Sequence, residues 1–409
     1  MNRSIWLLVI ALLVGVNAAS AAQGRFASLL ASVSAARGSG DAGSGGGEVE
    51  NPGPSPGMDF TQADAAFENF LSESPVFDGI SYVVVNADGV MHKAVFGDHT
   101  EELVVMLAST SKVPAVMTLL ALDEDPEVAF SMDEPVGTML SYEGVYTDRT
   151  VEQMVSNTSG IPGLAALDDY GSPFGQTLDA VNHLCSFVSQ EFVNFEACGQ
   201  QLLTTELPNS RPAGEAFDYG GSQWQAAGVT ASVAANATWN QLVDQYLGAP
   251  CDLEVFTFGN PWQELSVGST SFNGTVESLP GQANPNVEGG AITNLDDYAK
   301  LLQVHLNGGF CGDTRVLSEA ALASMRTDRG GVVPEDPVPY GMGWWISTDN
   351  PGVYDDPGAF GAVSFIDVER GLAGYVAIDD YTSTDSGAPV ALVRETIIPL
   401  LQAAYDSSQ

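Results

Sequence analysis

The sequence is poor in positive charge. Its 409 residues contain 13 lysines and arginines against 52 aspartates and glutamates, which gives a formal net charge of −39 at pH 7. Only three of these cations are lysines: Lys93, Lys112 and Lys300. Affinity for nucleic acid comes mainly from Lys and Arg side chains that displace counterions from phosphates. We therefore expect no nucleic-acid partner and no docking on an anionic membrane.

Cysteine and histidine are also scarce, with four residues of each kind in the chain. None of their spacings matches a zinc site, and no acidic run carries the central glycine of an EF-hand calcium loop. The sequence therefore indicates neither a metal nor a cofactor. In contrast, 44% of the residues are hydrophobic and only 16% are charged, which is typical of a globular protein rather than of a disordered acidic tail.

An apolar segment lies at the N-terminus, where residues 5–16 follow a single arginine, Arg3, and small residues then lead to Ala22. This order is typical of a secretory signal peptide, and the apolar run is too short to cross a bilayer comfortably. We predict that residues 1–22 are cleaved and that the mature protein is secreted or periplasmic, without a membrane span. An uncleaved membrane anchor is the alternative, because Arg3 is the only charge before the run.

Residues 23–58 become rich in glycine, serine and then proline, a composition that predicts a flexible linker with nothing to bury. The folded domain is expected to span residues 59–409. All four cysteines lie in this domain, and an even number of cysteines in an exported protein favours disulfides. We expect Cys185 to pair with Cys198, its nearest neighbour in sequence, and Cys251 to pair with Cys311. Buried free thiols are the alternative.

Two predicted β-hairpins lie near the ends of this domain, and mostly helical patterns lie between them. The strand-like runs alternate around short turns, whereas the helical runs repeat their apolar residues every three or four positions. We expect an α+β fold in which one antiparallel sheet is built from N- and C-terminal strands, flanked by helices, with an inserted, mostly helical lobe at about residues 126–284. The expected strands are 80–85, 90–96, 362–367 and 372–378, and the expected helices are 111–122, 151–156, 222–235, 294–306, 318–325 and 389–404.

Ser109 and Lys112 lie where an apolar run gives way to a predicted helix. If Ser109 opens that helix, the two side chains lie one turn apart on the same face, so the lysine amine can take the serine proton. A helix N-terminus also favours an anionic oxygen. The S-x-x-K spacing is nevertheless common by chance. Tyr219 precedes another predicted helix, where a phenol could share a proton with a lysine or simply pack in an interface.

Five sequence blocks occur in an order that resembles the serine β-lactamase and penicillin-binding protein superfamily. The closest branch is the class C β-lactamase-like one, which also contains D,D-carboxypeptidases, esterases and amide hydrolases. The resemblance covers about residues 60–405, and its order and spacing are far more specific than any single block. It implies a β-lactamase/transpeptidase-like α+β fold. The blocks are Ser109–Lys112, Thr150–Pro162, Pro212–Tyr219, Glu288–Asn294 and Tyr340–Trp345.

This resemblance implies roles for three side chains. Ser109 would be the acylated nucleophile, Lys112 its proton partner, and Tyr219 the general base and acid. The third family motif aligns with Asp356-Pro357-Gly358, so Asp356, Gly358 and Gly221 would lie beside the substrate. The backbone N–H groups of Ser109 and Ala359 would form the oxyanion hole, because preorganised donors stabilise developing negative charge.

Three positions depart from the family pattern. The second motif, Tyr-x-Asn, reads Tyr219-Gly220-Gly221 here, so its amide is missing, and Asn157 replaces a common histidine. Asp356 puts a carboxylate where the family usually has a cation that attracts a substrate carboxylate. A like charge in a cleft repels such substrates unless an arginine compensates, for which Arg394 is a candidate.

The expected function is therefore that of a secreted serine hydrolase that forms an acyl-enzyme with a neutral or cationic ester or amide, either a small molecule or a peptide. One alternative is a β-lactamase or D,D-carboxypeptidase that acts on carboxylate-bearing substrates. The other is a catalytically inactive binding protein that retains the fold, since a fold alone does not establish a function. A monomer is expected.

Overall fold

The computed structural model describes residues 57–74, 76–164, 183–187, 194–260, 272, 274–378 and 387–409. The predicted signal peptide, and the predicted linker except for its last two residues, lie outside this part of the chain, so both stay predictions. Within the described residues, no helix is long and apolar enough to cross a membrane.

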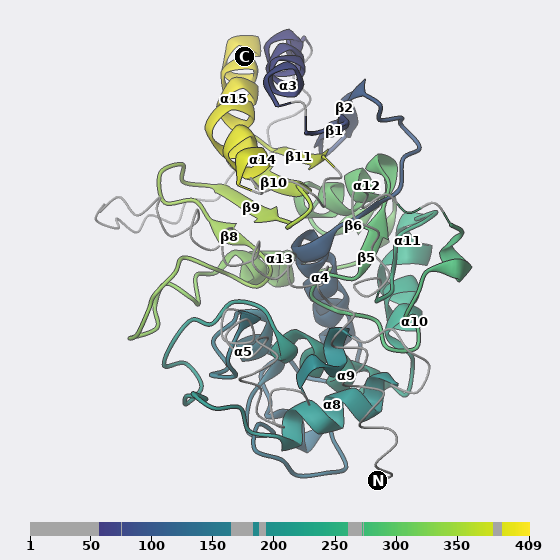
Figure 1. Ribbon diagram of the computed structural model, residues 1–409, viewed down its shortest axis with the longest axis vertical. Helices are drawn as coiled ribbons and strands as arrows, with labels where there is room; N and C mark the ends of the chain where they lie inside the picture. The colour runs from purple at the N-terminus through teal and green to yellow at the C-terminus, as the bar shows by residue number, and fades with distance from the viewer. Residues whose placement is uncertain are drawn as a thin grey trace.

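The main sheet has six antiparallel strands in the order β2-β1-β11-β10-β9-β8 (Figure 1). β1 pairs with β11, with Ser81 opposite Ala377, so strands from both ends of the domain meet at the centre of the sheet. The prediction of an antiparallel sheet built from N- and C-terminal strands is confirmed. The strands are β1 (Gly79–Asn86), β2 (Gly89–Gly97), β8 (Trp345–Ile346), β9 (Val353–Pro357), β10 (Val363–Asp367) and β11 (Leu372–Ala377).

Side-chain acceptors close the turns of both predicted hairpins. Asn86 Oδ1 accepts the N–H groups of Asp88 and Gly89 in the β1–β2 turn. Asp367 Oδ1 accepts two N–H groups in the same way in the β10–β11 turn. Asn and Asp are favoured in turns because they supply such local hydrogen bonds, which explains why both hairpins are readable in the sequence.

Helices cover both faces of the main sheet, and the strand residues alternate between them as the pleat requires. Tyr82 and Val84 pack toward the helices drawn at the top of Figure 1, whereas Val83 and Val85 join the core on the other side, which contains α12. The covering helices are α3 (Thr61–Glu73), α14 (Ala388–Ala391) and α15 (Ile398–Ser408), with the π-helical turn η7 (Leu392–Ile397), on one side and α12 (Leu295–Leu306) on the other.

The helical part of the chain forms the lower half of Figure 1. Its helices α4 (Lys112–Asp123) and α9 (Ser222–Ala235) are buried along most of their length, as expected for helices inside a core. The predicted helices are confirmed with ends within one or two residues, except that the last begins one residue earlier, continues to Ser408 and contains a π-turn. The helical elements not yet named are η1 (Ala108–Ser111), η2 (Val136–Thr138), α5 (Val151–Val155), η3 (Leu184–Phe187), α8 (Phe195–Thr204), α10 (Trp239–Val243), η4 (Asp244–Gly248), α11 (Ala249–Cys251), η6 (Val276–Ser278) and α13 (Glu319–Arg326).

A small three-stranded sheet has the order β3-β5-β4. It connects the segment of the predicted nucleophile, Ser109–Lys112, to the rest of the core. Its middle strand is β5 (Ala291–Thr293), which pairs with β3 (Val105–Met106) and β4 (Thr257–Phe258). A separate pair is formed by β6 (Phe310–Cys311) and β7 (Thr314–Arg315). Because β3 leads directly into η1 and the end of the fourth sequence block forms β5, these two blocks lie side by side.

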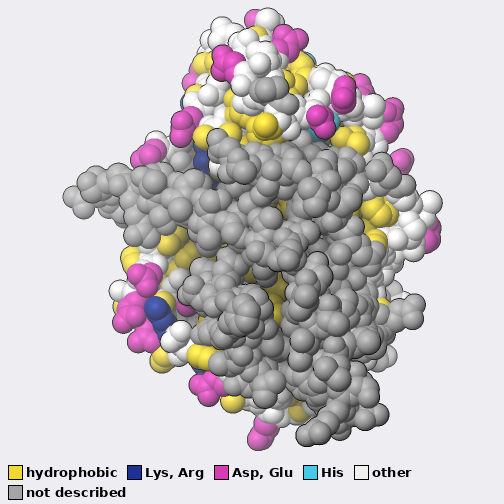
Figure 2. Space-filling model, viewed as in Figure 1, with side chains coloured by type: hydrophobic (Ala, Val, Ile, Leu, Met, Phe, Trp, Pro, Cys, Tyr) yellow, Lys and Arg dark blue, Asp and Glu magenta, His cyan; other side chains and the backbone are white. Residues whose placement is uncertain are grey.

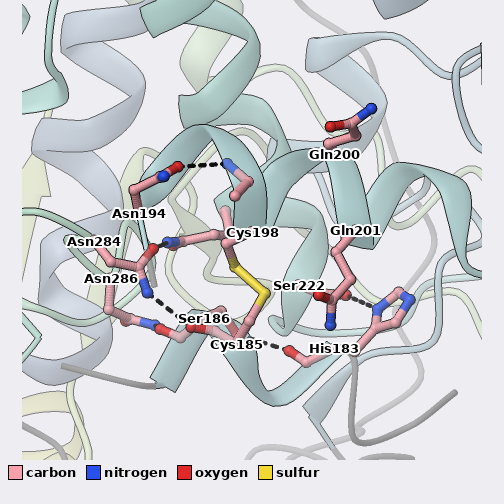
Figure 3. The surroundings of a disulfide bond; sticks show 12 residues. His183, Cys185, Ser186, Asn194, Cys198, Gln200, Gln201, Ser222, Asn284 and Asn286 are labelled. Atoms are coloured by element: carbon pink, nitrogen blue, oxygen red, sulfur yellow. Dashed lines mark hydrogen bonds between the residues drawn. A yellow bond between two sulfur atoms is a disulfide. The ribbon is translucent and has the colours of Figure 1, made fainter. Parts of the chain in front are cut away.

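Both expected disulfides are present. Cys185 pairs with Cys198, which joins η3 to α8, and Cys251 pairs with Cys311, which joins the end of α11 to β6. Figure 3 shows the first disulfide beside His183, whose Nδ1 lies 2.6 Å from Ser222 Oγ at the start of α9. The predicted cysteine pairing is confirmed, and the first disulfide lies in the segment that supports the N-terminus of α9.

The surface reflects the charge imbalance of the sequence. Figure 2 shows Asp and Glu side chains scattered over the described part of one face, with few Lys or Arg among them. Two partly exposed cations form ion pairs with such acids: Lys93 with Glu101 and Asp296, and Arg370 with Asp406. The exposed Arg315 lies over the ring of Phe310. The surface therefore has little positive charge to offer an anionic partner.

Candidate active site

Ser109 lies in η1, in the turn immediately before α4. The preceding residue, Ala108, has φ +48°, a left-handed conformation that is costly for a residue with a Cβ. Thr110 Oγ1 donates to the backbone oxygens of Asp356 and Ala362, 3.0 and 3.1 Å away, and so ties η1 to β9 and the start of β10. The neighbouring sheet thus holds the predicted nucleophile in a strained turn.

Lys112 is fully buried one helical turn after Ser109. Its Nζ lies 3.1 Å from Ser109 Oγ and donates to the backbone oxygen of Glu288 at 3.0 Å. The same nitrogen lies 4.7 Å from the centre of the Tyr219 ring. Burial lowers the pKa of Lys112, whereas the nearby carboxylates of Glu288 and Asp356 oppose that shift. The amine is therefore within hydrogen-bond reach of the serine proton.

Tyr219 lies in an aromatic group on the other side of Lys112. Its ring centre is 5.1 Å from that of Trp345 and 6.0 Å from that of Tyr340. Its hydroxyl oxygen has no full hydrogen bond within the described part of the chain. Burial and the charge of Asp356 raise the pKa of Tyr219 well above its usual value, while the neighbouring Ser109 hydroxyl opposes the shift. The phenol is thus held neutral and close to the serine.

Glu288 is a site residue that the sequence analysis did not single out. Its side chain is 3% exposed, and Oε2 accepts the N–H of Gly221 at 2.8 Å and lies 3.5 Å from Lys112 Nζ. Its second carboxylate oxygen, Oε1, has no partner among the described residues. Burial raises the pKa of Glu288, and Lys112 lowers it. A charged residue inside an otherwise apolar and glycine-rich block was the signal that could have identified it.

The two glycines of the altered second motif accommodate Glu288 in different ways: Gly220 leaves space for its carboxylate, and Gly221 donates its N–H to it. Gly221 has φ +84° and ψ −163°, a conformation that residues with a Cβ rarely adopt. A Cβ on Gly220 would lie 2.7 Å from Glu288 Oε2 and 2.6 Å from Leu164 Cδ1. The missing amide is therefore replaced by a backbone N–H that binds a carboxylate, rather than by empty space.

Asp356 is fully buried on β9, beneath the nucleophile turn. Its Oδ2 accepts the N–H of Val113 at 3.4 Å, and its Oδ1 has no partner in the described part of the chain. Burial raises the pKa of Asp356 well above its usual value, and Lys112 lowers it. The carboxyl therefore belongs to the buried cluster around Lys112, and its predicted contact with a substrate stays a prediction.

The suggestion that Arg394 compensates Asp356 is wrong. Arg394 Nε and Nη2 donate to the two carboxylate oxygens of Asp355, at 2.5 and 2.7 Å. Successive strand residues point to opposite faces, so Asp355 meets η7 whereas Asp356 points toward α4. Among the described residues, no Lys or Arg lies within ion-pair distance of Asp356.

The β9–β10 turn approaches η1 closely. A Cβ on Gly358 would lie 2.2 Å from the backbone oxygen of Leu107 and 2.8 Å from Thr110 Oγ1, so this approach requires glycine. The N–H of Gly358 donates to the Ala362 oxygen, and the buried Ala359 follows it. These contacts bring the third motif next to the nucleophile turn. The oxyanion hole of Ser109 and Ala359, and the substrate contacts of Gly221 and Gly358, stay predictions.

Asn157 stabilises the turn that carries Tyr219 through hydrogen bonds. Its Oδ1 accepts the N–H of Gly220 at 2.9 Å and Nε1–H of Trp224 at 2.8 Å, and its backbone oxygen accepts the N–H of Asp218. The residue is buried with φ +61°. Asn tolerates this left-handed conformation better than most residues do. Asn157 is therefore a structural support for the turn that carries Tyr219.

Metal ligands do not gather in this region. In the described ranges of the chain, no group of three or more His, Cys, Asp or Glu could hold a metal ion. The site combines one amine, one serine hydroxyl, buried phenols and two carboxyls. Such a group can move protons and form a covalent bond with a carbonyl carbon.

Comparisons with known proteins agree with this geometry. A family model described as Beta-lactamase matches residues 64–395. Among curated proteins, no sequence matches the chain. Solved structures share the fold at low identity, which by itself supports only the fold. They include the octameric penicillin-binding protein homologue from Pyrococcus abyssi, with 17% identity, a TM-score of 0.63, and 84% of this chain and 78% of that chain covered.

Two further structures carry hydrolase descriptions. A family VIII carboxylesterase has 17% identity and a TM-score of 0.60, and the alignment covers 85% of this chain and 97% of that one. A D-stereospecific amidohydrolase from Streptomyces sp. has 17% identity and a TM-score of 0.57, with 83% and 99% covered. The β-lactamase/transpeptidase-like α+β fold expected from the sequence is thereby confirmed.

Proposed function

The chain belongs to the β-lactamase family, and on this premise we propose that it is a serine hydrolase that forms an acyl-enzyme on Ser109 with an ester or amide substrate. The observation that carries this proposal is the 3.1 Å distance between Lys112 Nζ and Ser109 Oγ in a buried site next to Tyr219. A lysine that is buried beside a serine is a base matched to that nucleophile.

In the proposed acylation step, Ser109 Oγ gives its proton to the neutral Lys112 amine and bonds to the substrate carbonyl carbon. The backbone N–H groups of Ser109 and Ala359 would stabilise the oxyanion. The Tyr219 hydroxyl then protonates the leaving oxygen or nitrogen as its bond to carbon breaks, and the proton on Lys112 restores the phenol. Hydrolysis repeats these steps with water as the nucleophile and Ser109 as the leaving group.

We further propose that the substrate is neutral or cationic near its acyl group. Support comes from the charges of the site, where Glu288 and Asp356 are buried near Lys112 and no arginine among the described residues forms an ion pair with Asp356. A substrate carboxylate would add a third negative group to this cluster. We therefore expect carboxylate-bearing β-lactams and D-Ala-D-Ala peptides to be turned over poorly.

Export is part of the same proposal. Two disulfides, together with the signal-like N-terminus, favour a secreted or periplasmic protein, because disulfides persist in oxidising compartments. The expected monomer stays a prediction, and the octamer described for the Pyrococcus abyssi protein is a property of that protein. Light scattering on the purified protein would measure the mass of the assembly.

The test is intact-mass labelling with a fluorophosphonate, followed by a panel of short acyl esters, amides and the β-lactam nitrocefin. We expect one adduct on the natural protein, none on Ser109→Ala, and faster turnover of the neutral esters than of nitrocefin. Comparable turnover of nitrocefin would contradict the substrate proposal and favour the β-lactamase alternative. No serine-dependent adduct with any of several acylating probes would favour the inactive binding protein.

A further inference from the structure

Glu288 makes three contacts that converge on the nucleophile. Its backbone oxygen accepts a hydrogen bond from Lys112 Nζ at 3.0 Å, and its carboxylate Oε2 lies 3.5 Å from the same nitrogen. That oxygen also accepts the N–H of Gly221 at 2.8 Å, which fixes the orientation of the carboxylate. Lys112 Nζ in turn lies 3.1 Å from Ser109 Oγ. The three side chains thus form a continuous series from serine through lysine to glutamate.

The surroundings are arranged to hold this carboxylate in place. Gly220 has no Cβ to collide with Oε2, and the backbone of Gly221 turns its N–H toward it. Glu288 is almost completely buried, and burying a carboxylate beside an amine without good geometry is costly. Local backbone geometry that residues with a Cβ rarely adopt is thus used to place one charge next to Lys112.

We propose that Glu288 is a positioning residue that orients Lys112 and stabilises the ammonium formed when Ser109 gives up its proton. The inference rests on the proposed acyl-enzyme function and concerns the same site. The proton moves from Ser109 Oγ to Lys112 Nζ while Oγ bonds to the substrate carbonyl carbon, and the resulting cation is paired with the Glu288 carboxylate. The glutamate gains and loses no proton itself. Its part resembles that of the carboxylate in a serine–histidine–aspartate triad.

Two opposing consequences follow for the dependence of acylation on pH. The Glu288 charge favours the ammonium form of Lys112, so it moves the pH at which the amine becomes a base upward. The same charge lowers the energy of the transition state in which the ammonium forms, so it raises the maximal rate. The other ionisable groups that interact with this cluster are Asp356 from β9, Tyr219 from the turn before α9, and Tyr340 from the segment before β8.

Asp356 differs from Glu288 in the contact it makes. Its nearest donor is the N–H of Val113, and its carboxylate is not within ion-pair distance of Lys112. Asp356 therefore affects Lys112 only through its field, whereas Glu288 also fixes the position of the amine. Removing the charge of Glu288 should change the maximal rate and the pH profile together.

The experiment measures the second-order acylation rate of a fluorophosphonate between pH 5 and pH 10 for the natural protein, Glu288→Gln and Glu288→Asp. Gln keeps an acceptor for the Gly221 N–H but removes the charge. For Glu288→Gln we expect the rising limb to move down by on the order of one pH unit and the plateau rate to fall about tenfold. For Glu288→Asp, which keeps the charge on a shorter chain, we expect a limb near its original pH and a lower plateau.

Asp297→Asn is the matched control, because Asp297 is also buried and bound by backbone N–H groups but lies on α12, away from Lys112. We expect the rising limb of its acylation rate to lie at the same pH as in the natural protein. If Glu288→Gln still forms a serine-dependent adduct and its acylation rate rises at the same pH as in the natural protein, the role of Glu288 is overturned. The hydrolase proposal would then still stand. The absence of any serine adduct on the natural protein would remove both. If Glu288→Gln does not fold, the test rests on Glu288→Asp. A rising limb of its acylation rate that lies a full pH unit away from that of the natural protein would refute the inference.

Discussion

Buried carboxyl groups occur in two regions of this protein, and the two regions differ in how fully these groups are hydrogen-bonded. At the start of α12, the two oxygens of Asp297 accept the N–H groups of Glu254, Val255 and Phe256 at 2.7 to 3.0 Å. In the candidate active site, Glu288 and Asp356 each keep one oxygen without a hydrogen-bond partner among the described residues. Buried polar groups are normally satisfied, so the second arrangement is the unusual one.

The difference is that between a carboxylate bound fully by the fold and two carboxyls of the candidate site. Asp297 fixes the loop after α11 by accepting several backbone donors, and every one of its interactions contributes to the fold. Glu288 lies within ion-pair distance of Lys112, Asp356 acts on the same amine through its charge, and both keep an unpaired oxygen next to the predicted nucleophile. Strained backbone and buried polar atoms without hydrogen-bond partners are concentrated at functional sites, where some stability is lost in favour of reactivity.

The largest expected effect comes from removing the amine that lies between the predicted nucleophile and Glu288. Lys112→Met keeps the length of the side chain but cannot accept the Ser109 proton, so we expect acylation to slow by at least about a thousandfold. The rate of fluorophosphonate labelling measures it. Lys300→Met is the control, because Lys300 binds the backbone oxygen of Asp252 and takes no part in the site. If Lys112→Met were labelled at a rate near that of the control, Lys112 would not be the base that accepts the Ser109 proton.

The structural region should depend strongly on the disulfide beside it. Cys251 ends α11 just before the loop held by Asp297, and its bond to Cys311 spans a sequence separation of 60 residues. Replacing both cysteines by alanine should lower the free energy of unfolding by about 4 kcal/mol, because the unfolded chain gains entropy. Urea denaturation measures it.

Removal of the shorter Cys185–Cys198 link, with a separation of 13, should cost less, about 3 kcal/mol. The two double variants therefore serve as controls for each other. An equal or reversed order of the two losses would show that strain or residual structure, rather than chain entropy, sets the contribution of these disulfides.

Asp297→Asn tests the structural carboxylate directly. The amide cannot accept as many N–H bonds as the carboxylate, and its own NH2 group faces backbone donors. We expect the free energy of unfolding to fall by about 2 kcal/mol, while kcat/KM for an ester substrate stays within about twofold of the natural value. Urea denaturation and steady-state kinetics measure the two quantities. A loss of activity without a loss of stability would reverse the roles assigned to the two regions.

The smallest effect, and one of opposite sign, is expected for Asp356→Asn. Burial raises the pKa of Asp356 in the folded state above its usual value of 3.8, so the unfolded chain releases this proton more readily. As pH rises from about 4, the folded state loses stability until the folded pKa is passed. Asn has no proton to release, so the variant should be more stable than the natural protein at pH 7. The gain should disappear below pH 4, and urea denaturation at both pH values measures it; lower stability at pH 7 would contradict the assignment.

Much of the fold and part of the site could be predicted from local patterns. The two hairpins have turn residues that hydrogen-bond to their own backbone, and the helices begin with capping residues such as Thr150, Asn294 and Ser318, so their positions depend on neighbours in sequence. Ser109 and Lys112 share one helical turn, and the structure places Tyr219 beside them.

Glu288 could not be recognised in the same way, because its contacts are with residues far away in the chain. Lys112 precedes it by 176 positions and Gly221 by 67. The opposite directions of Asp355 and Asp356 also depend on which face of β9 meets α4, and this decided that Arg394 pairs with the first and not with the second. Strand periodicity predicts that two neighbours diverge, but not which of them enters the site.

By itself, then, the sequence determined the shortage of cations, the two β-hairpins, the positions of the predicted helices, the cysteine pairs and the serine–lysine spacing. Each of these depends on composition or on residues close together in the chain, apart from the cysteine pairing, which followed from proximity and elimination. Only the tertiary structure decided that Gly220 leaves space for the Glu288 carboxylate, that Gly221 donates an N–H to it, and that Lys112 lies between Ser109 and Glu288. The physical reason is that a buried charge is defined by everything packed around it, and those neighbours come from distant parts of the chain.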